Sequence, residues 1–160
     1  MTDKSRRDLL RMRRAVMRAE QVLAEIDRRL LAPLQLCSSD LGILERLARK
    51  GARPVNGLAG RVGLTSGSMT TAVQRLRRRG LVDTRRGLED KRIVWVSPTR
   101  EGVDLAQRIT RRRGQLLESV FRDISAREQS LLAALLKRVR KSGEEALRQR
   151  GLAEHAGPGA

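Results

Sequence analysis

The chain has 160 residues, and 35 Lys and Arg against 18 Asp and Glu give it a formal net charge of +17 at pH 7. This length suits one domain with helical extensions. With one Phe, one Trp and no Tyr, the core must be built from Leu, Val, Ile, Met and Ala. Such a charge carries little information about fold, but it favours polyanions as partners, above all nucleic acid.

An anionic membrane surface is the alternative partner for so basic a chain. It would require a basic helix with a bulky aromatic or leucine-rich face. No apolar run approaches the ~20 residues of a spanning helix, and the N-terminus lacks an apolar signal segment. The single cysteine, Cys37, offers no intramolecular disulfide. We expect a cytoplasmic protein without a membrane partner.

Residues 1–33 are predicted to form one long helix that ends at Pro33. Its apolar residues follow one another in alternating steps of three and four, at Leu9, Met12, Val16, Ala19, Leu23, Ile26 and Leu30. A stripe this narrow is typical of a seam between helices rather than of a helix buried in a globular core. We expect residues 1–33 to be a dimerisation helix.

The central part of the chain, residues 34–98, predicts a helix-turn-helix followed by a hairpin. Ser38 or Ser39 can cap one helix that stops at Gly51, and Pro54 can open a short helix to Val62. The turn falls on Gly63, and Thr65 or Ser66 caps the next helix, which stops at Gly80. Ala59, Gly63 and Met69 have the spacing typical of a helix-turn-helix. The small Ala59 lets the two helices approach, Gly63 permits the turn, and the bulky apolar Met69 fills the gap below them.

Two strands, Leu81–Arg86 and Arg92–Ser97, are predicted on either side of a turn at Gly87–Lys91, with Pro98 ending the second strand. Thr99 can cap a long helix after it. Ser125 and Glu128 form a capping box for a last helix, with an apolar stripe at Leu131, Leu132, Leu135, Leu136 and Val139. Residues 99–150 are therefore expected to be C-terminal dimerisation helices, and residues 151–160 a disordered tail.

The outward face of the helix after Gly63 is small and polar in its first half and basic in its second. With Met69 and Leu76 pointing inward, the outward residues are Gly67, Ser68, Thr71, Gln74, Arg75 and Arg78. Small hydroxyl and amide side chains at a helix N-terminus can enter the DNA major groove and bind base edges, while the arginines contact phosphates. A plain solvated run of arginines is the alternative.

The turn of the hairpin carries a second basic group. Arg92 can enter the minor groove, whose narrow A/T stretches concentrate negative potential. Asp90 would be a poor DNA ligand, so we expect it to brace the loop, and Arg85 and Arg86 add charge beside it. The alternative is a hairpin that is merely made soluble by its charges.

At this point the chain resembles the MarR (multiple antibiotic resistance regulator) family of transcription factors. The resemblance rests on Leu58–Val82 (LAGRVGLTSGSMTTAVQRLRRRGLV), on Asp90-Lys91-Arg92 and on Thr99-Arg100-Glu101-Gly102. It covers residues 34–102 by motif and the rest by helix order. The family implies a homodimer of winged helix-turn-helix domains joined through N- and C-terminal helices. It also implies a pseudo-palindromic operator, repression that a small effector releases, and association with the bacterial nucleoid when the protein is bound to DNA.

Carried over residue by residue, the family's major-groove role falls on Ser66, Ser68, Thr71, Gln74 and Arg75. Its minor-groove arginine falls on Arg92 and its bracing aspartate on Asp90. Together with the residue patterns, the expected DNA-binding set is Ser66, Ser68, Thr71, Gln74, Arg75, Arg78, Arg86, Asp90 and Arg92. The expected dimerisation set is Leu9, Met12, Val16, Leu23, Leu132, Leu135 and Val139.

The predicted fold is thus mainly α with a small β hairpin, a winged helix-turn-helix with N- and C-terminal dimerisation helices. The predicted function is a sequence-specific regulator of transcription that binds double-stranded operator DNA as a homodimer, most simply as a repressor that responds to a small-molecule effector of unknown identity. A basic protein that coats DNA without sequence preference is the main alternative, since +17 per chain supports it equally.

Cys37 supports a further alternative, a redox-responsive regulator. It lies just before a predicted helix start, where the helix dipole favours a thiolate, and some relatives of the family sense oxidants through one cysteine. Free cysteines are more often inert small apolar residues. With one Cys and one His, a zinc site is not expected, and neither is a cofactor. No catalytic arrangement stands out, so we do not expect an enzyme.

Overall fold

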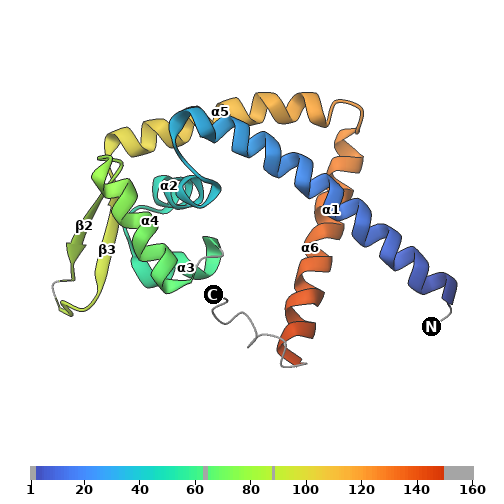
Figure 1. The fold of residues 1–160 in the computed structure, drawn as a ribbon, viewed down its shortest axis with the longest axis horizontal. Coiled ribbons are helices and arrows are strands. Elements are labelled where there is room, and N and C mark those ends of the chain that lie inside the picture. Colours follow the sequence, from blue (N-terminus) through green and yellow to red (C-terminus); the bar gives the residue numbers. More distant parts are fainter. Residues whose placement is uncertain (1–2, 63–64, 88, 150–160) are drawn as a thin grey trace. The chain divides into compact units, whose positions relative to one another are not determined.

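The computed structural model describes residues 3–62, 65–87 and 89–149, without the side chains of residues 59–62 and 66 (Figure 1). Its elements are α1 (Asp3–Leu31), the 3-10 helix η1 (Ala32–Leu34), α2 (Ser38–Lys50), β1 (Arg53–Pro54), α3 (Val55–Val62), α4 (Ser66–Arg78), β2 (Val82–Arg86), β3 (Val94–Pro98), α5 (Arg100–Val120) and α6 (Ala126–Gln149). The predicted class, mainly α with a small β element, is confirmed. Two compact units divide the chain within α5, after Gly114.

The core of the first unit lies where α2, α3, α4 and the sheet meet. Its fully buried side chains come from each of these elements, at Leu41, Ile43, Leu44, Leu47, Leu58, Met69, Leu76, Val82 and Val96. Burying an aliphatic side chain of this size stabilises the fold by roughly 1.5–3 kcal/mol. Met69, Ala72, Val73 and Leu76 form the inward face of α4, as the periodicity predicted, so the opposite face is free for a ligand.

The sheet has three strands rather than the two of the predicted hairpin, in the order β1-β3-β2. Both neighbours run antiparallel to β3, with Arg53 opposite Val96 on one side and Thr84 opposite Val96 on the other. Pro54 was expected to open a helix but is the last residue of β1, and α3 begins at Val55. Proline fits there because an edge strand tolerates the missing N–H. Pro98, expected to end the strand, is its last paired residue, opposite Val82.

The junction between α1 and α2 also differs from the prediction. The α-helix α1 ends at Leu31, and Pro33 lies inside η1 rather than at the helix end. After Gln35, whose backbone is left-handed (φ 51°), the N-cap of α2 is Cys37 rather than Ser38 or Ser39. The cap is completed by Asp40, whose carboxylate accepts a hydrogen bond from the backbone N–H of Cys37 at 3.0 Å.

The start of α5 packs tightly on Gly80 and Leu81, which join α4 to β2. The Thr99 hydroxyl donates to the carbonyl of Gly80 at 2.7 Å and accepts from the N–H of Gly102 at 3.1 Å, so Thr99 caps α5 as predicted. Gly102 is buried, and a Cβ atom there would lie 2.0 Å from the carbonyl oxygen of Leu81. Only glycine therefore allows this approach.

The second unit consists of the end of α5 and of α6. The Ser125–Glu128 capping box is present: the backbone N–H of Ser125 donates to Glu128 at 2.8 Å, and the N–H of Glu128 donates to the Ser125 hydroxyl at 3.3 Å. The apolar stripe of α6 is exposed in the single chain, as are Leu9, Met12 and Val16 of α1. None of the described helices is long and apolar enough to cross a membrane.

Candidate nucleic-acid interface

The N-terminal half of α4 presents the small polar side chains that the sequence singled out. Thr65 is the N-cap: its hydroxyl accepts from the N–H of Ser68 at 3.3 Å and donates to the Ser68 hydroxyl at 2.9 Å. Thr71 donates to the carbonyl of Gly67 at 3.2 Å. Ser68 and Thr71 are both exposed. The side chain of Ser66 and the turn residue Gly63 lie outside the described residues.

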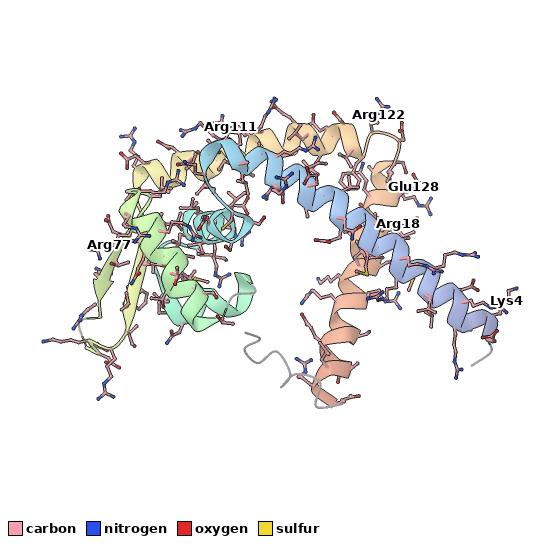
Figure 2. All side chains as sticks on the ribbon, in the orientation of Figure 1. Lys4, Arg18, Arg77, Arg111, Arg122 and Glu128 are labelled. Carbon is pink, nitrogen blue, oxygen red and sulfur yellow. The ribbon has the colours of Figure 1, made fainter. Side chains whose placement is uncertain are left out.

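A cleft of about 630 Å³ lies between α4 and the sheet. Gln74 of α4 lines it, and so does Arg92 beyond the turn of the hairpin. Three further arginines line it from the two sides, Arg77 from α4 and Arg85 and Arg86 from β2. The figures show α3, α4 and the two long strands gathered at one end of the first unit, with Arg77 labelled on α4 (Figure 2). This concave basic surface suits a polyanion.

The turn of the hairpin is held by its own backbone. The N–H of Gly87 donates to the carbonyl of Ile93 at 2.8 Å, and the N–H of Ile93 donates to the carbonyl of Asp90 at 3.1 Å. The Asp90 carboxylate accepts from the N–H of Arg92 at 2.8 Å. Asp90 thus binds loop backbone. The exposed guanidinium of Arg92 has no ion pair with any described residue, and the same holds for Arg78 and Arg86.

Arg75 differs from these arginines because its guanidinium is bound inside the protein. It donates from Nη2 to Asp40 Oδ1 at 2.6 Å and from Nε to Asp40 Oδ2 at 3.2 Å. The Asp40 carboxylate is buried (1 % exposed), whereas the Arg75 side chain is 37 % exposed. This bidentate geometry is the strong form of an Arg–carboxylate pair. Arg75 therefore joins α4 to the start of α2.

In the Asp40–Arg75 pair, each side chain stabilises the charged form of the other. Burial alone would raise the pKa of Asp40, but hydrogen bonds from Arg75 and from Cys37 outweigh it and hold the pKa below its ordinary value. The pKa of Arg75 is raised by the same hydrogen bond. Cys37 Sγ lies 3.1 Å from Asp40 Oδ2 and 3.4 Å from Arg75 Nη2, so the single exposed thiol touches the pair.

One helical turn further on, Arg79 makes a second link to the same junction. Its Nη1 and Nη2 atoms donate to the carbonyls of Gln35 and Leu34, both at 2.8 Å. Arg75 thus binds the first turn of α2 and Arg79 binds the segment between α1 and α2, while Arg77 and Arg78 have exposed side chains. Sequence reasoning missed Asp40 and the bonds of Arg79. Asp40 is the third residue of α2, a position that favours carboxylates, and that was the available signal.

Residues 38–94 match the family model of the MarR family. This chain carries a MarR-family domain. Over 97 residues it is 26% identical to YwhA of Bacillus subtilis, an uncharacterised HTH-type transcriptional regulator, covering 61% of this chain and 70% of YwhA. The transcriptional regulator BldR of Sulfolobus solfataricus is 26% identical, with a TM-score of 0.71 over 88% of this chain and 99% of BldR.

Two further solved structures share the fold of this chain. A mutant MarR from E. coli in complex with operator DNA has a TM-score of 0.73 and 22% identity, over 82% of this chain and 95% of that one. BpsR of Bordetella bronchiseptica, whose DNA binding is regulated by 6-hydroxynicotinic acid, has a TM-score of 0.72 and 20% identity, over 81% and 98%.

These comparisons confirm the predicted family and the winged helix-turn-helix fold. They also confirm the predicted general function, a DNA-binding regulator of transcription. YwhA and BldR are both described as transcriptional regulators.

Proposed function

We propose that two copies of this chain bind one pseudo-palindromic operator and repress transcription by occupying it, until a small effector releases them. The observation that carries the proposal is the surface of α4. The N-terminal half of α4 presents small, polar, exposed side chains. It adjoins a cleft lined by Arg77, Arg85, Arg86 and Arg92. A helix of this kind fits the major groove, and the basic hairpin fits the flanking backbone and minor groove.

Within this proposal the side chains have separate roles. Ser68, Thr71 and Gln74 face base edges, and the Gln74 amide offers both a donor and an acceptor, as bidentate readout of adenine requires. Arg78 and Arg86 contact phosphates, Arg92 enters the minor groove and Asp90 holds the loop. Ser66 belongs to the family's major-groove set. Arg75 is reassigned from DNA contact to a positioning role, because its guanidinium is occupied by Asp40.

The second copy follows from apolar surface that the single chain leaves uncovered. Leu9, Met12 and Val16 of α1 and Leu132, Leu135 and Val139 of α6 are all between 41% and 55% exposed, and Leu23 continues the row on α1. Two-fold symmetry would bury both rows against their counterparts. It would also place two copies of α4 about one turn of DNA apart, roughly 34 Å, in successive major grooves.

The effector proposal rests on a second cleft, between α2 and α5. Its volume is about 670 Å³, and its lining includes Glu45 and Arg49 of α2 and Thr110 and Arg111 of α5. Beside it, Arg113 bridges Asp27 of α1 at 2.8 Å and Glu45 at 3.2 Å. A ligand that competes for Glu45 would loosen three helices at once. The hydroxylated aromatic acid that regulates BpsR is the class of compound to test first.

The experiment is binding-site selection from a random duplex library, with the wild type, Gln74→Ala and Arg92→Ala. We expect the wild type to select a two-fold symmetric site with a preference of ~10³ or more over random DNA at physiological salt. Gln74→Ala should change the selected bases, and Arg92→Ala should weaken binding broadly. Arg127→Ala, an exposed charge at the start of α6, is the control and should change neither.

Three outcomes would contradict the proposal. A wild type that binds with a steep salt dependence but selects no site would be a DNA-coating protein, the main alternative. An unchanged base preference in Gln74→Ala would remove that residue from the groove. If Gln74→Ala and Arg92→Ala leave every activity intact, the fold serves as an interaction module without DNA.

A further inference from the structure

Half of the long helix α1 carries a row of cations that the operator-binding surface does not use. Five of them follow one another in alternating steps of three and four residues, at Lys4, Arg7, Arg11, Arg14 and Arg18. At 3.6 residues per turn these steps keep one face, and the row is roughly 21 Å long. All five side chains are exposed. Figure 2 labels the two ends of the row, Lys4 and Arg18.

Almost nothing within the described residues neutralises this cation row. Its one ion pair joins Arg7 to Asp3 at 3.1 Å, with side chains that are 73% and 82% exposed, so water screens it strongly. The other end of α1 is different, since Glu25 binds both Arg28 and Arg29 there. Like charges three and four residues apart destabilise a helix. The row therefore carries a cost, which a bound polyanion would offset.

The cation row also remains available when the apolar row of α1 is covered. Leu9, Met12 and Val16 lie roughly 150° around the helix from the centre of the cation row. A second copy packed on the apolar row would therefore leave the cations facing solvent. The operator-binding surface has its own arginines on α4 and the hairpin, so the cation row is additional charge.

We propose that the cation row is a second DNA-binding surface, which contacts the phosphate backbone of duplex DNA outside the operator. The proposal rests on the DNA-binding function argued above. Guanidinium groups match phosphate geometry, and duplex DNA presents one charge per about 1.7 Å of axis, so a straight row of cations suits it. A helix lying in a membrane surface carries Trp, Phe or Leu on the face opposite its cations. α1 has no aromatic residue, and the apolar row opposite its cations is the surface that the proposed dimer would cover.

The test compares two fourfold variants with equal loss of charge. One removes the row (Arg7→Gln, Arg11→Gln, Arg14→Gln, Arg18→Gln), and the control removes exposed cations of α6 (Lys137→Gln, Arg138→Gln, Lys141→Gln, Arg148→Gln). Each is titrated over a salt series with a short operator duplex and with the same operator inside long random flanks. Circular dichroism checks that α1 remains helical, which glutamine favours.

We expect the row variant to bind the long duplex at least tenfold more weakly than the wild type. The slope of log affinity against log salt should fall by about 3.6, since four phosphate contacts are lost and each is worth about 0.9. Affinity for the short duplex should change less than twofold, and the control should keep the wild-type values on both. Equal losses in the two variants would mean a net-charge effect and would overturn the proposal.

Two other outcomes separate this inference from the proposed function. Binding of phosphatidylserine vesicles that the row variant loses, with unchanged DNA binding, would make the row a membrane contact and overturn the inference. A wild type that binds long random DNA through the row but selects no operator would support the row and refute the operator-binding function. A wild type that binds no DNA would refute both.

Discussion

The carboxylate of Asp40 holds the guanidinium of Arg75 through two hydrogen bonds of 2.6 and 3.2 Å, and so joins the first turn of α2 to α4, the candidate DNA-binding helix. Arg79 binds the carbonyls of Leu34 and Gln35, and so fixes the end of α4 to the segment between α1 and α2. α4 is thereby held from its inner side by charged bonds while its outer side stays free. The position of α4 depends on these links as well as on the apolar residues of its buried face.

Replacing Asp40 with Asn should therefore weaken both stability and operator binding. Breaking a buried pair costs about 3–5 kcal/mol, but Arg75 is 37% exposed, so solvent screening reduces the expected loss to about 1–3 kcal/mol. Urea unfolding measures the stability and duplex titration the affinity. Asp104→Asn, at an exposed position of α5, is the matched control and should match the wild type. Equal stability of the two variants would show that the pair contributes nothing.

The same pair predicts a particular dependence on pH. Because the folded-state pKa of Asp40 lies below its ordinary value of 3.8, the ionised carboxylate stabilises the fold at all pH values above 3.8. That contribution is lost as pH falls through the lowered pKa. The stability difference between wild type and Asp40→Asn should therefore be constant from pH 7 to 5 and shrink below 3.8. A difference that grows on acidification would contradict the assignment.

Gly102→Ala should destabilise the joint between the sheet and α5. The new methyl group would sit 2.0 Å from the Leu81 carbonyl oxygen, so the helix start must shift, at a cost of about 2–4 kcal/mol. Gly114→Ala in the same helix is the control, because a Cβ there meets nothing within 4 Å. It should stabilise the protein by up to about 1 kcal/mol. Thermal unfolding distinguishes the two, and equal effects would refute the close approach.

A charge placed in the exposed apolar row of α6 should separate the proposed dimer. We expect Leu135→Glu to sediment as a monomer and to bind a two-half-site operator at least tenfold more weakly, because a carboxylate would be buried without a partner. Ala133→Glu adds the same charge on the other side of α6 and should remain dimeric. A wild type that sediments as a monomer at micromolar concentration would refute the dimer itself.

Cys37→Ser tests the redox alternative at the thiol that touches the Asp40–Arg75 pair. Serine is a good N-cap, so the reduced variant should keep wild-type stability within about 0.5 kcal/mol. The chain has no second cysteine to form an internal disulfide. We expect peroxide to leave the operator affinity unchanged in both the wild type and the variant. A loss of affinity in the wild type alone would establish Cys37 as a sensor.

The sequence by itself determined the order of the elements and the inward face of α4. Those signals are local. Apolar residues recur with the helical period. Gly51 and Gly80 end helices through their left-handed backbone, and the hydroxyls of Thr99 and Ser125 cap helix starts. The family resemblance came from the same contiguous stretch. The predictions were wrong where the structure depends on long-range pairing. Pro54 is an example: local sequence rules place it at the start of a helix, but in the structure it pairs with β3 as part of the sheet.

Only the tertiary structure decided what each arginine of α4 does. In the sequence Arg75, Arg77, Arg78 and Arg79 are one basic run, and periodicity placed Arg75 on the DNA face. In the fold Arg75 binds a buried carboxylate 35 residues away, and Arg79 binds carbonyls 44 and 45 residues away. A buried charge requires a partner, and no local pattern reveals which distant residue will supply it. The sequence therefore identified α4 as the candidate DNA-binding helix, and the three-dimensional fold separated its arginines that are exposed without a partner among the described residues from those that bind other parts of the protein.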